Sequence, residues 1–470
     1  MKILKKTISV FLLLIIILLA YFLRINNYNE IPPPGESADE YSFTWLGLSL
    51  LQVGKPIAGS GLAPYIPTLK YINVDGYYHR TYSPNPSAVV SPWFDHPPLF
   101  GLLTGGYTYL KGIHNFADAS ISLIRKPMIW IGVLNVFLLF IFVRIISDIK
   151  IAFVSALIYA TEPLIVISSR MAQAENLLIT FFLLSLITFH TYFKTKKNTY
   201  FWLAIAIAGI ATLVKVSGWS IAISLILLTA VSNSKEKMLR SLSILLGVLL
   251  IFLLFPLYGY IYDWALFKEI FYSNTARSLG DGIGILNTFF FKQNITKTFG
   301  SGWIPLGWIS LAILTYVKTR SLKKDWIILP VISYLLIYLT FGSQGYGWYK
   351  FPFFPFLIAA IGTLLIQTIK YPNIVYNYFL LFLPGSYMLY RFLDINYLAS
   401  NLLYFRVTTL IIFMFMLINY IFPKKKQAKY LYLSFMSIIF LLLIGLNIYT
   451  TLHINIDTWL NMNWLQSFSF

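Results

Sequence analysis

Apolar residues fall in repeated runs along the chain, and short clusters of Lys and Arg separate one run from the next. Most runs hold about 16 to 22 residues, the length of helix needed to cross a hydrocarbon layer of roughly 30 Å. The pattern therefore predicts an all-α integral membrane protein that crosses the bilayer many times. We expect thirteen crossings, near residues 8–23, 127–146, 150–168, 175–193, 200–216, 217–232, 241–262, 303–317, 325–341, 351–369, 373–391, 402–421 and 430–449.

Composition agrees with this class and excludes others. The mean hydropathy is +0.72 and only 11% of residues are charged, which is too apolar for one water-soluble core in a chain of 470 residues. The absence of cysteine excludes disulfides and thiolate metal sites. A net charge of +19 is compatible with nucleic-acid binding, but the basic residues lie in short clusters between apolar runs, as membrane orientation requires. We therefore expect no nucleic-acid partner.

The basic clusters predict the orientation. The first apolar run, residues 8–22, follows three lysines, and no small-x-small cleavage site precedes Arg24. We interpret it as an uncleaved signal anchor, which leaves the N-terminus in the cytoplasm of a multi-pass cell-membrane protein. Thirteen crossings then place most basic clusters on the cytoplasmic side. Those clusters are Lys2/Lys5/Lys6, Arg144/Lys150, Lys194/Lys196/Lys197, Lys235/Lys237/Arg240, Lys318/Arg320/Lys323/Lys324, Lys370 and Lys424/Lys425/Lys426/Lys429.

This topology requires that the moderately apolar stretch Leu99 to Leu110 does not cross. The stretch is short and holds three glycines, so we predict an interfacial or re-entrant helix. Residues 1–470 would then form a single polytopic membrane domain without a soluble C-terminal domain. The predicted external segments are 24–126, which carries interfacial helices, 263–302, and the shorter 169–174 and 342–350.

Asp39 and Glu40 stand side by side just past the first apolar run. Ser37 followed by Glu40 has capping-box spacing, which predicts a helix that ends at Val53. One reading makes Glu40 a reciprocal cap and Asp39 a residue that favours the helix dipole. The other makes them catalytic, because a helix that begins just above the bilayer places carboxylates where a hydrophilic acceptor meets a lipid-borne donor.

Glu175 begins the fourth predicted crossing and faces the same external side as Asp39. Two carboxylates at one site suggest a base with an orienting or metal-binding partner, and they are compatible with a divalent cation without requiring one. Arg170 lies on the same short turn. The alternative is that Arg170 and Glu175 form an ion pair at the membrane surface with no chemical role.

Two further cations lie near the external boundary. Lys215 ends the fifth predicted crossing, and Lys350, beside Tyr349, begins the tenth. The phosphate of a long-chain isoprenoid phosphate would lie at this depth, although anchoring to lipid head groups is an equal explanation for Lys350. His96 precedes two prolines, which indicates either a rigid turn or a contact with a phosphate or an acceptor.

The order of several short strings resembles the glycosyltransferases of the GT-C fold. The nearest branches are the protein O-mannosyltransferases and the lipid A aminoarabinose transferases, with their dolichyl-phosphate-mannose-protein mannosyltransferase-like bacterial relatives. The resemblance covers roughly the first half of the chain and thins towards the C-terminus. The strings are Ala38-Asp39-Glu40, Gly54-Lys55-Pro56, His96-Pro97-Pro98-Leu99, Ser169-Arg170-x-Ala172-x-x-Glu175, Gly209 to Lys215, and Tyr349-Lys350-Phe351-Pro352.

The resemblance implies a GT-C fold with about 13 transmembrane helices, a polyprenyl-phosphate sugar as donor, and inverting transfer at the external or periplasmic face. By the same resemblance Asp39 is the base. Glu40 and Glu175 are further candidate catalytic carboxylates because of their positions beside Asp39 in sequence and on the same external side. Lys215, Lys350 and Arg170 would bind the donor phosphate. His96 and Tyr349 would contact the donor or the acceptor, although the family often has a basic residue in place of His96.

Two other function classes stay open. A lipid-linked oligosaccharide transporter or flippase would also be basic and polytopic, but it would show inverted repeats and charges at the midplane. An O-antigen-type ligase or polymerase would depend on external arginines in late loops, for which Arg277 is the candidate. The pattern leaves open the sugar and whether the acceptor is a lipid, an envelope glycan or a protein.

Overall fold

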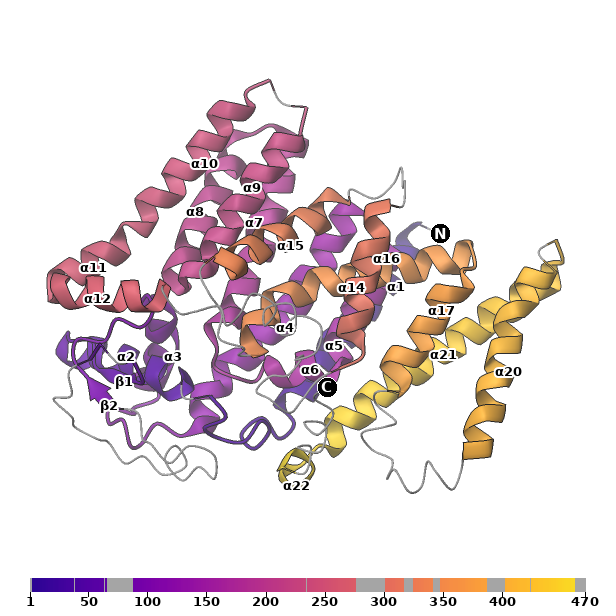
Figure 1. Cartoon of the computed structure of the whole chain (residues 1–470), viewed down its shortest axis with the longest axis horizontal. Helices are drawn as coiled ribbons and strands as arrows, with labels where there is room; N and C mark the ends of the chain where they lie inside the picture. Colours follow the sequence, from indigo (N-terminus) through magenta and orange to yellow (C-terminus); the bar gives the residue numbers. More distant parts are fainter. Residues whose placement is uncertain are drawn as a thin grey trace.

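The computed structural model describes residues 2–37, 39–62, 64–65, 88–233, 235–275, 301–316, 324–340, 347–386, 402–422 and 424–460. These residues are almost entirely helical (Figure 1). One small antiparallel sheet pairs β1 (Ala58–Ser60) with β2 (Ala88–Val90), with Gly59 opposite Val89. The predicted all-α class is confirmed.

Within the described residues, helices lie in each stretch predicted to cross the membrane. The first half of the chain holds α1 (Lys2–Ile25), α2 (Asp39–Val53), α3 (Leu99–Leu110), α4 (Ile121–Ile146), α5 (Ile149–Thr161), α6 (Pro163–Ser168), α7 (Ala174–Thr195), α8 (Asn198–Val214), the 3-10 helix η1 (Val216–Gly218), α9 (Trp219–Val231), α10 (Lys237–Phe252), α11 (Leu254–Tyr262) and α12 (Trp264–Thr275). The second half holds α14 (Trp303–Tyr316), α15 (Asp325–Thr340), the 3-10 helix η2 (Gly347–Phe353), α16 (Phe354–Lys370), α17 (Ile374–Leu381), the π-helix η3 (Phe382–Ser386), α20 (Leu402–Ile421), α21 (Lys426–His453) and α22 (Ile456–Leu460).

Among the described residues, six helical stretches are long and apolar enough to span a bilayer, and shorter apolar helices accompany them. A multi-pass membrane protein is therefore confirmed, while the number of thirteen crossings stays a prediction. The six long spans are Thr7–Ile25, Ile121–Ile146, Ala174–Thr195, Lys237–Tyr262, Gly347–Ile369 and Lys426–His453.

Ionisable residues stand at two breaks between helices, one inside the third predicted crossing and one at the end of the fifth. The third divides into α5 and α6 at Glu162, whose Oε2 accepts a hydrogen bond of 2.6 Å from the backbone N–H of Ile165 and so begins α6. Lys215 separates α8 from η1 and has an extended backbone, with φ −157° and ψ 143°. At both interruptions an ionisable side chain lies where a continuous helix would otherwise be apolar.

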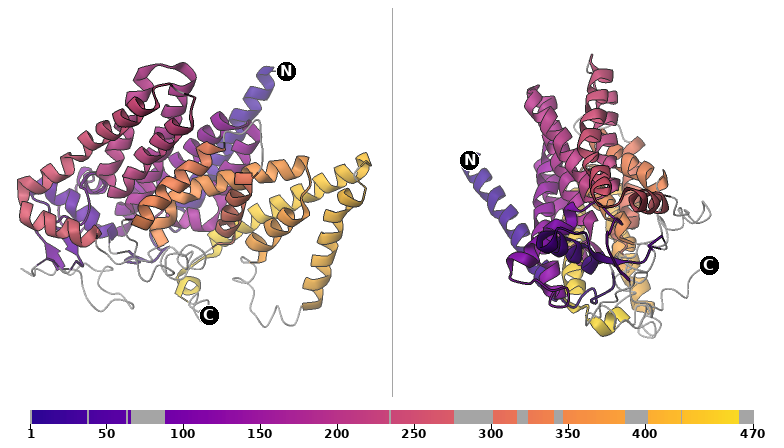
Figure 2. Two further views of the ribbon diagram at one scale, coloured as in Figure 1. Left: turned by 45° about the horizontal axis from the view of Figure 1, so that its top comes forward. Right: turned by 90° about the vertical axis from the view of Figure 1, so that its left-hand side faces the viewer.

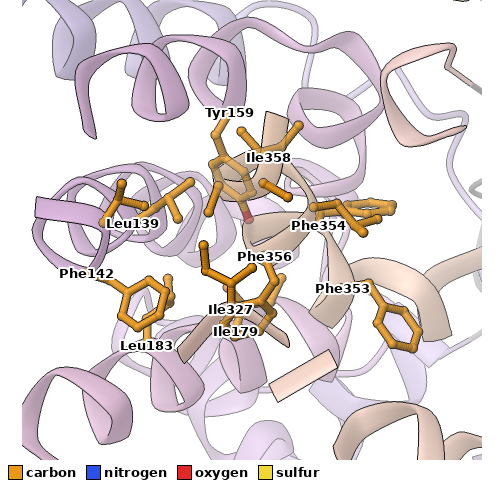
Figure 3. Close-up of a cluster of buried hydrophobic side chains, with 14 of the residues drawn as sticks. Leu139, Phe142, Tyr159, Ile179, Leu183, Ile327, Phe353, Phe354, Phe356 and Ile358 are labelled. Carbon is orange, nitrogen blue, oxygen red and sulfur yellow. The ribbon is translucent and has the colours of Figure 1, made fainter. Parts of the chain in front are cut away.

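The largest core packs helices that are distant in sequence against α16. In Figure 3, Phe142 of α4, Leu183 of α7 and Ile327 of α15 lie around Phe356 of α16. The α16 span is the most enclosed, with 83% of its apolar window buried against 22% for α1. Because α16 is covered on all sides by other helices, its position is set by packing, whereas α1 presents most of its surface outward.

The first loop folds into a layer at one end of the helices. Figure 1 shows α2, α3 and the two strands together, with α11 and α12 beside them. The backbones of α2 and α3 approach closely, because a Cβ on Gly47 would lie 1.9 Å from the carbonyl oxygen of Gly101 and one on Gly105 would lie 2.5 Å from the Cα of Gly47. The predicted helix over Leu99–Leu110 is present as α3. At 1.5 Å per residue it extends about 18 Å, less than the hydrocarbon thickness.

Parts of the predicted external segments lie outside the described residues. Arg277 and most of the segment 263–302 are among them, as are residues 342–346. The described beginning of the second segment is α12, which packs on α11 and on the first loop through Phe94, whose ring centroid lies 5.5 Å from that of Phe267. The two external segments therefore meet at an aromatic contact.

Candidate active site

Asp39 is the first residue of α2, one position nearer the start of the helix than predicted, and it is partly exposed. Its backbone N–H donates to Ser37 Oγ at 3.3 Å, which fixes the start of the helix. Its carboxylate lies close enough to both Glu175 and Lys215 to interact with them electrostatically. The fold thus brings together three of the predicted site residues, from three separate elements.

Glu175 and Lys215 form a buried ion pair next to Asp39. Glu175 lies in the first turn of α7 and is fully buried, and the Lys215 ammonium donates to its Oε1. The same ammonium lies 4.4 Å from the centroid of the Tyr349 ring, a cation–π distance. The extended backbone at Lys215 turns its side chain out of the helical path towards these partners. Glu175 binds the predicted external cation Lys215, and the role of Lys215 in binding a donor phosphate stays a prediction.

The backbone of Tyr349 accepts a hydrogen bond from a second tyrosine, Tyr334, which the sequence analysis did not identify. The buried Tyr334 of α15 donates its hydroxyl proton to the carbonyl oxygen of Tyr349 at 2.9 Å. This bond fixes the backbone that carries the ring beneath Lys215. Tyr334 is one of 33 tyrosines and lies inside an apolar run, so no sequence pattern distinguishes it.

Lys350 leaves η2 in a different direction from Tyr349, because successive residues of a 3-10 helix point about 120° apart. Its side chain is only 5% exposed and lines a small cavity with Ile304 and Trp308 of α14. Lys215 and Lys350, predicted to act on one phosphate, therefore lie against different neighbours.

Glu40 is fully buried in an ion pair with Arg125 of α4. Its Oε1 accepts from Arg125 Nε at 2.8 Å and from the N–H of Ala172 at 2.8 Å, and its Oε2 accepts from Arg125 Nη2 at 2.7 Å. These bonds go to Arg125 and Ala172, so they give no support to the reading of Glu40 as a reciprocal cap on Ser37. The geometry favours a structural role for Glu40 over the predicted catalytic one.

Arg125 was missed, although a signal existed. It lies at the end of the predicted external loop, where the positive-inside rule disfavours cations. Its Nη1 also donates to the carbonyl oxygens of Tyr28 at 3.0 Å and Pro32 at 2.6 Å. A cation on the unfavoured side is thus kept by partners that only the fold supplies.

Arg170 is also bound to the beginning of the first loop. It is 1% exposed and donates to the carbonyl oxygens of Leu23 at 2.7 Å and Ile31 at 3.2 Å. Arg24, equally buried, donates to the carbonyl oxygen of Ala160 at 3.1 Å. These bonds favour a positioning role for Arg170 over the predicted contact with donor phosphate, because its guanidinium already binds backbone carbonyls.

His96 lies in an aromatic cluster of the first loop. Its ring stacks on Phe43 of α2 at 5.2 Å and meets Trp93 edge-on at 5.9 Å. The two following prolines lead directly into α3. The interpretation as a rigid turn accounts for these contacts, and a role in substrate contact stays a prediction.

Asp95 joins the strands to α12. Its Oδ2 accepts from Ser60 Oγ at 2.7 Å, and its carbonyl oxygen accepts from Asn274 Nδ2 at 3.0 Å. Burial, together with the nearby Asp95 carboxylate, raises the pKa of Tyr65 above its ordinary value. The polar groups of this loop are therefore used to hold the loop together.

No group of three metal-ligating side chains occurs within the part of the chain that the structure describes. Asp39 and Glu175 are the two carboxylates that meet there, and the Lys215 ammonium lies on Glu175. These three ionised side chains carry a formal net charge of −1, and the Lys215 ammonium is the cationic group among them.

Comparisons with known proteins agree with this fold. A family described as dolichyl-phosphate-mannose-protein mannosyltransferase matches residues 95–260. Comparison with curated proteins gives no match. The chain is similar to the structure of ArnT from Cupriavidus metallidurans bound to undecaprenyl phosphate, with a TM-score of 0.51, 13% identity, and coverage of 94% of this chain and 77% of that one.

Two longer proteins share the arrangement. The oligosaccharyltransferase from Archaeoglobus fulgidus has a TM-score of 0.52 and 14% identity, over 92% of this chain and 56% of that one. The arabinosyltransferase EmbB from Mycobacterium smegmatis has a TM-score of 0.51 and 10% identity, over 96% of this chain and 42% of that one. At these identities the structural likeness shows the fold alone. The predicted GT-C fold and the resemblance to the mannosyltransferase family are confirmed.

Proposed function

From the premise of a membrane glycosyltransferase with the GT-C fold, we propose that the protein moves a sugar from a polyprenyl-phosphate donor to an acceptor hydroxyl at the outer face of the cell membrane. The acceptor would be a lipid, an envelope glycan or a protein. The observation that carries the proposal is the meeting of Asp39 with the buried pair of Glu175 and Lys215. ArnT, which is similar in fold, was solved with undecaprenyl phosphate, and this supports the class of donor.

Asp39 serves as the general base. It accepts the proton of the acceptor hydroxyl while the hydroxyl oxygen forms a bond to C1 of the sugar from the face opposite the phosphate. The bond between C1 and the phosphate oxygen breaks, and its electron pair leaves with the polyprenyl phosphate. One displacement inverts the anomeric carbon. Partial exposure suits Asp39 for this role because an acceptor can reach its carboxylate.

Lys215 stabilises the leaving phosphate. An ammonium has three hydrogen-bond donors, and Glu175 receives one of them, so two remain for phosphate oxygens. Glu175 and the Tyr349 ring hold the ammonium in place before the donor arrives. Glu175 is therefore a positioning residue for Lys215, and its negative charge keeps Lys215 protonated. Lys350, one residue from Tyr349, is a second and more distant candidate for the donor.

The test uses the full-length protein in lipid nanodiscs with labelled polyprenyl-phosphate sugars and a panel of lipid, glycan and peptide acceptors. Asp39→Asn should lower transfer by at least about 100-fold, because general-base catalysis typically contributes 10²- to 10⁴-fold. The matched control is Glu30→Gln, which neutralises an exposed carboxylate of the same loop and should leave transfer unchanged.

Thermal unfolding of both variants separates lost chemistry from lost structure. A D39N protein that folds normally and still transfers within threefold of the wild type would remove the assigned base. Movement of labelled lipid across the bilayer, without any labelled product, would instead favour the transporter alternative.

A further inference from the structure

A second polar cavity lies at the opposite end of α7 from Glu175. Its volume is about 370 Å³, within the range of small-molecule sites. It lies between the end of α7, the end of α9 and the start of α10. The residues that line it are Tyr192, Phe193, Lys196, Thr229, Ser232, Asn233 and Arg240.

The helix α7 connects the two sites and sets their separation. Glu175 lies in its first turn and Tyr192 in its last, seventeen residues apart, or about 26 Å at 1.5 Å per residue. This distance approaches the hydrocarbon thickness, so the cavity lies near the other membrane surface. Figure 1 shows the α9–α10 connection at the end of these helices away from α2 and α3.

Arg240 is held rigidly at the wall of this cavity. Its Nη2 lies 3.0 Å from Glu236 Oε2, its Nε donates to the same carboxylate at 3.1 Å, and its Nη1 donates to Asn198 Oδ1 at 3.1 Å. The guanidinium also lies 5.0 Å from the ring centroid of Phe201 and 5.6 Å from that of Tyr192. These contacts use three of its five N–H groups, which leaves two in a fixed orientation for a ligand.

Lys196 is the second cation that lines the cavity, and its backbone has a positive φ angle. It is the C-cap of α7, with φ +59°, a left-handed conformation that favours glycine. Its N–H donates to the carbonyl oxygen of Tyr192 at 2.7 Å, and its ammonium lies 5.4 Å from the Phe193 ring centroid. The ammonium is exposed at the mouth of the cavity.

The charges favour an anion. Lys196 and Arg240 together outweigh Glu236, so the rim carries a net charge of +1. Leu239 and Leu242, on the same helix as Arg240, are 61% and 46% exposed and provide a surface for acyl chains. We propose that this cavity binds a phosphate-bearing anion, supplied either by the head group of an anionic phospholipid or by free phosphate.

The experiment measures lipid binding to the delipidated full-length protein by native mass spectrometry, with phosphatidylglycerol, phosphatidylcholine and inorganic phosphate as probes. Combining Lys196→Gln with Arg240→Gln should weaken phosphatidylglycerol binding by about tenfold or more, because it removes both charge-assisted contacts. The matched control combines Lys194→Gln with Lys197→Gln, two exposed lysines of the same turn that do not line the cavity. It should bind within twofold of the wild type.

The arms of the experiment identify the source of the phosphate. Tighter binding of phosphatidylglycerol than of phosphatidylcholine assigns the site to a lipid, whereas binding of inorganic phosphate alone assigns it to the free ion. Lys196→Gln by itself, at an exposed position, tests the proposal should the double variant not fold. Equal binding of every probe by wild type and lining variants would overturn the proposal. D39N should bind phosphatidylglycerol normally, so the result is independent of transferase activity.

Discussion

Glu40, next to Asp39, forms a buried ion pair with Arg125. Removing the charge of Glu40 tests whether this carboxylate stabilises the fold or takes part in the reaction. Glu40→Gln keeps the size of the side chain and removes its charge. Arg125 would then remain buried with its two carbonyl contacts but without a carboxylate, and the N–H of Ala172 would lose a charged acceptor. The change therefore removes the charged contacts of Glu40 near the site and leaves the Asp39 side chain unaltered.

The magnitude follows from burial. Both side chains are 0% exposed, and the pair is bidentate, with distances of 2.7 and 2.8 Å. Removing one member of such a pair typically costs about 3–5 kcal/mol, because the remaining charge stays in a low-dielectric interior. The double variant Glu40→Leu with Arg125→Met should lose less stability than the sum of the two single changes, because each single change leaves one buried charge unpaired whereas the double variant leaves none.

The assay is unfolding of the purified protein in mixed micelles by titration with sodium dodecyl sulfate, followed by circular dichroism. The control is Glu236→Gln, which breaks the partly exposed pair with Arg240 and should cost about 0–1 kcal/mol. Transfer per folded molecule should stay within about tenfold in E40Q, because the general base is retained. A loss of stability below about 1 kcal/mol in E40Q would refute the structural assignment.

Gly47→Ala should destabilise the first loop, because the new methyl group would lie 1.9 Å from the Gly101 carbonyl oxygen, whereas Gly106→Ala, with its nearest atom 3.8 Å away, should unfold like the wild type in the same titration. Lys215→Met should abolish transfer and destabilise the protein, and combining it with Glu175→Gln should restore stability in the unfolding assay without restoring labelled product. Burial raises the pKa of Tyr65 in the folded protein above its unfolded value of about 10. Its contribution to the free energy of unfolding is therefore complete below about pH 10 and falls as the pH rises beyond that value. The Tyr65→Phe variant should lose less stability than the wild type over this alkaline range when both are unfolded in the same titration.

The sequence alone determined the class of protein and most of its helices. Apolar runs of spanning length occur where the helices lie, because backbone groups in lipid must bond within their own segment and the chain has few other choices. Asp39 was identifiable because a carboxylate pair next to a membrane run is rare in a chain with 17 acidic residues. Leu99 to Leu110 was recognisable as a separate short helix from its length, and its non-crossing position stays a prediction.

The tertiary structure decided which charges face each other. Glu40 and Glu175 look alike in sequence, yet one pairs with Arg125 from α4 and the other with Lys215 from the break after α8. Lys215 and Lys350 likewise carry the same charge but lie against different helices. The hydrophobic periodicity of a sequence indicates which face of its own helix a side chain occupies. It does not indicate ion-pair partners 40 or 85 residues away, because these depend on how the helices pack. The free energy of a buried charge depends almost entirely on those partners, so only the assembled helices assign its role.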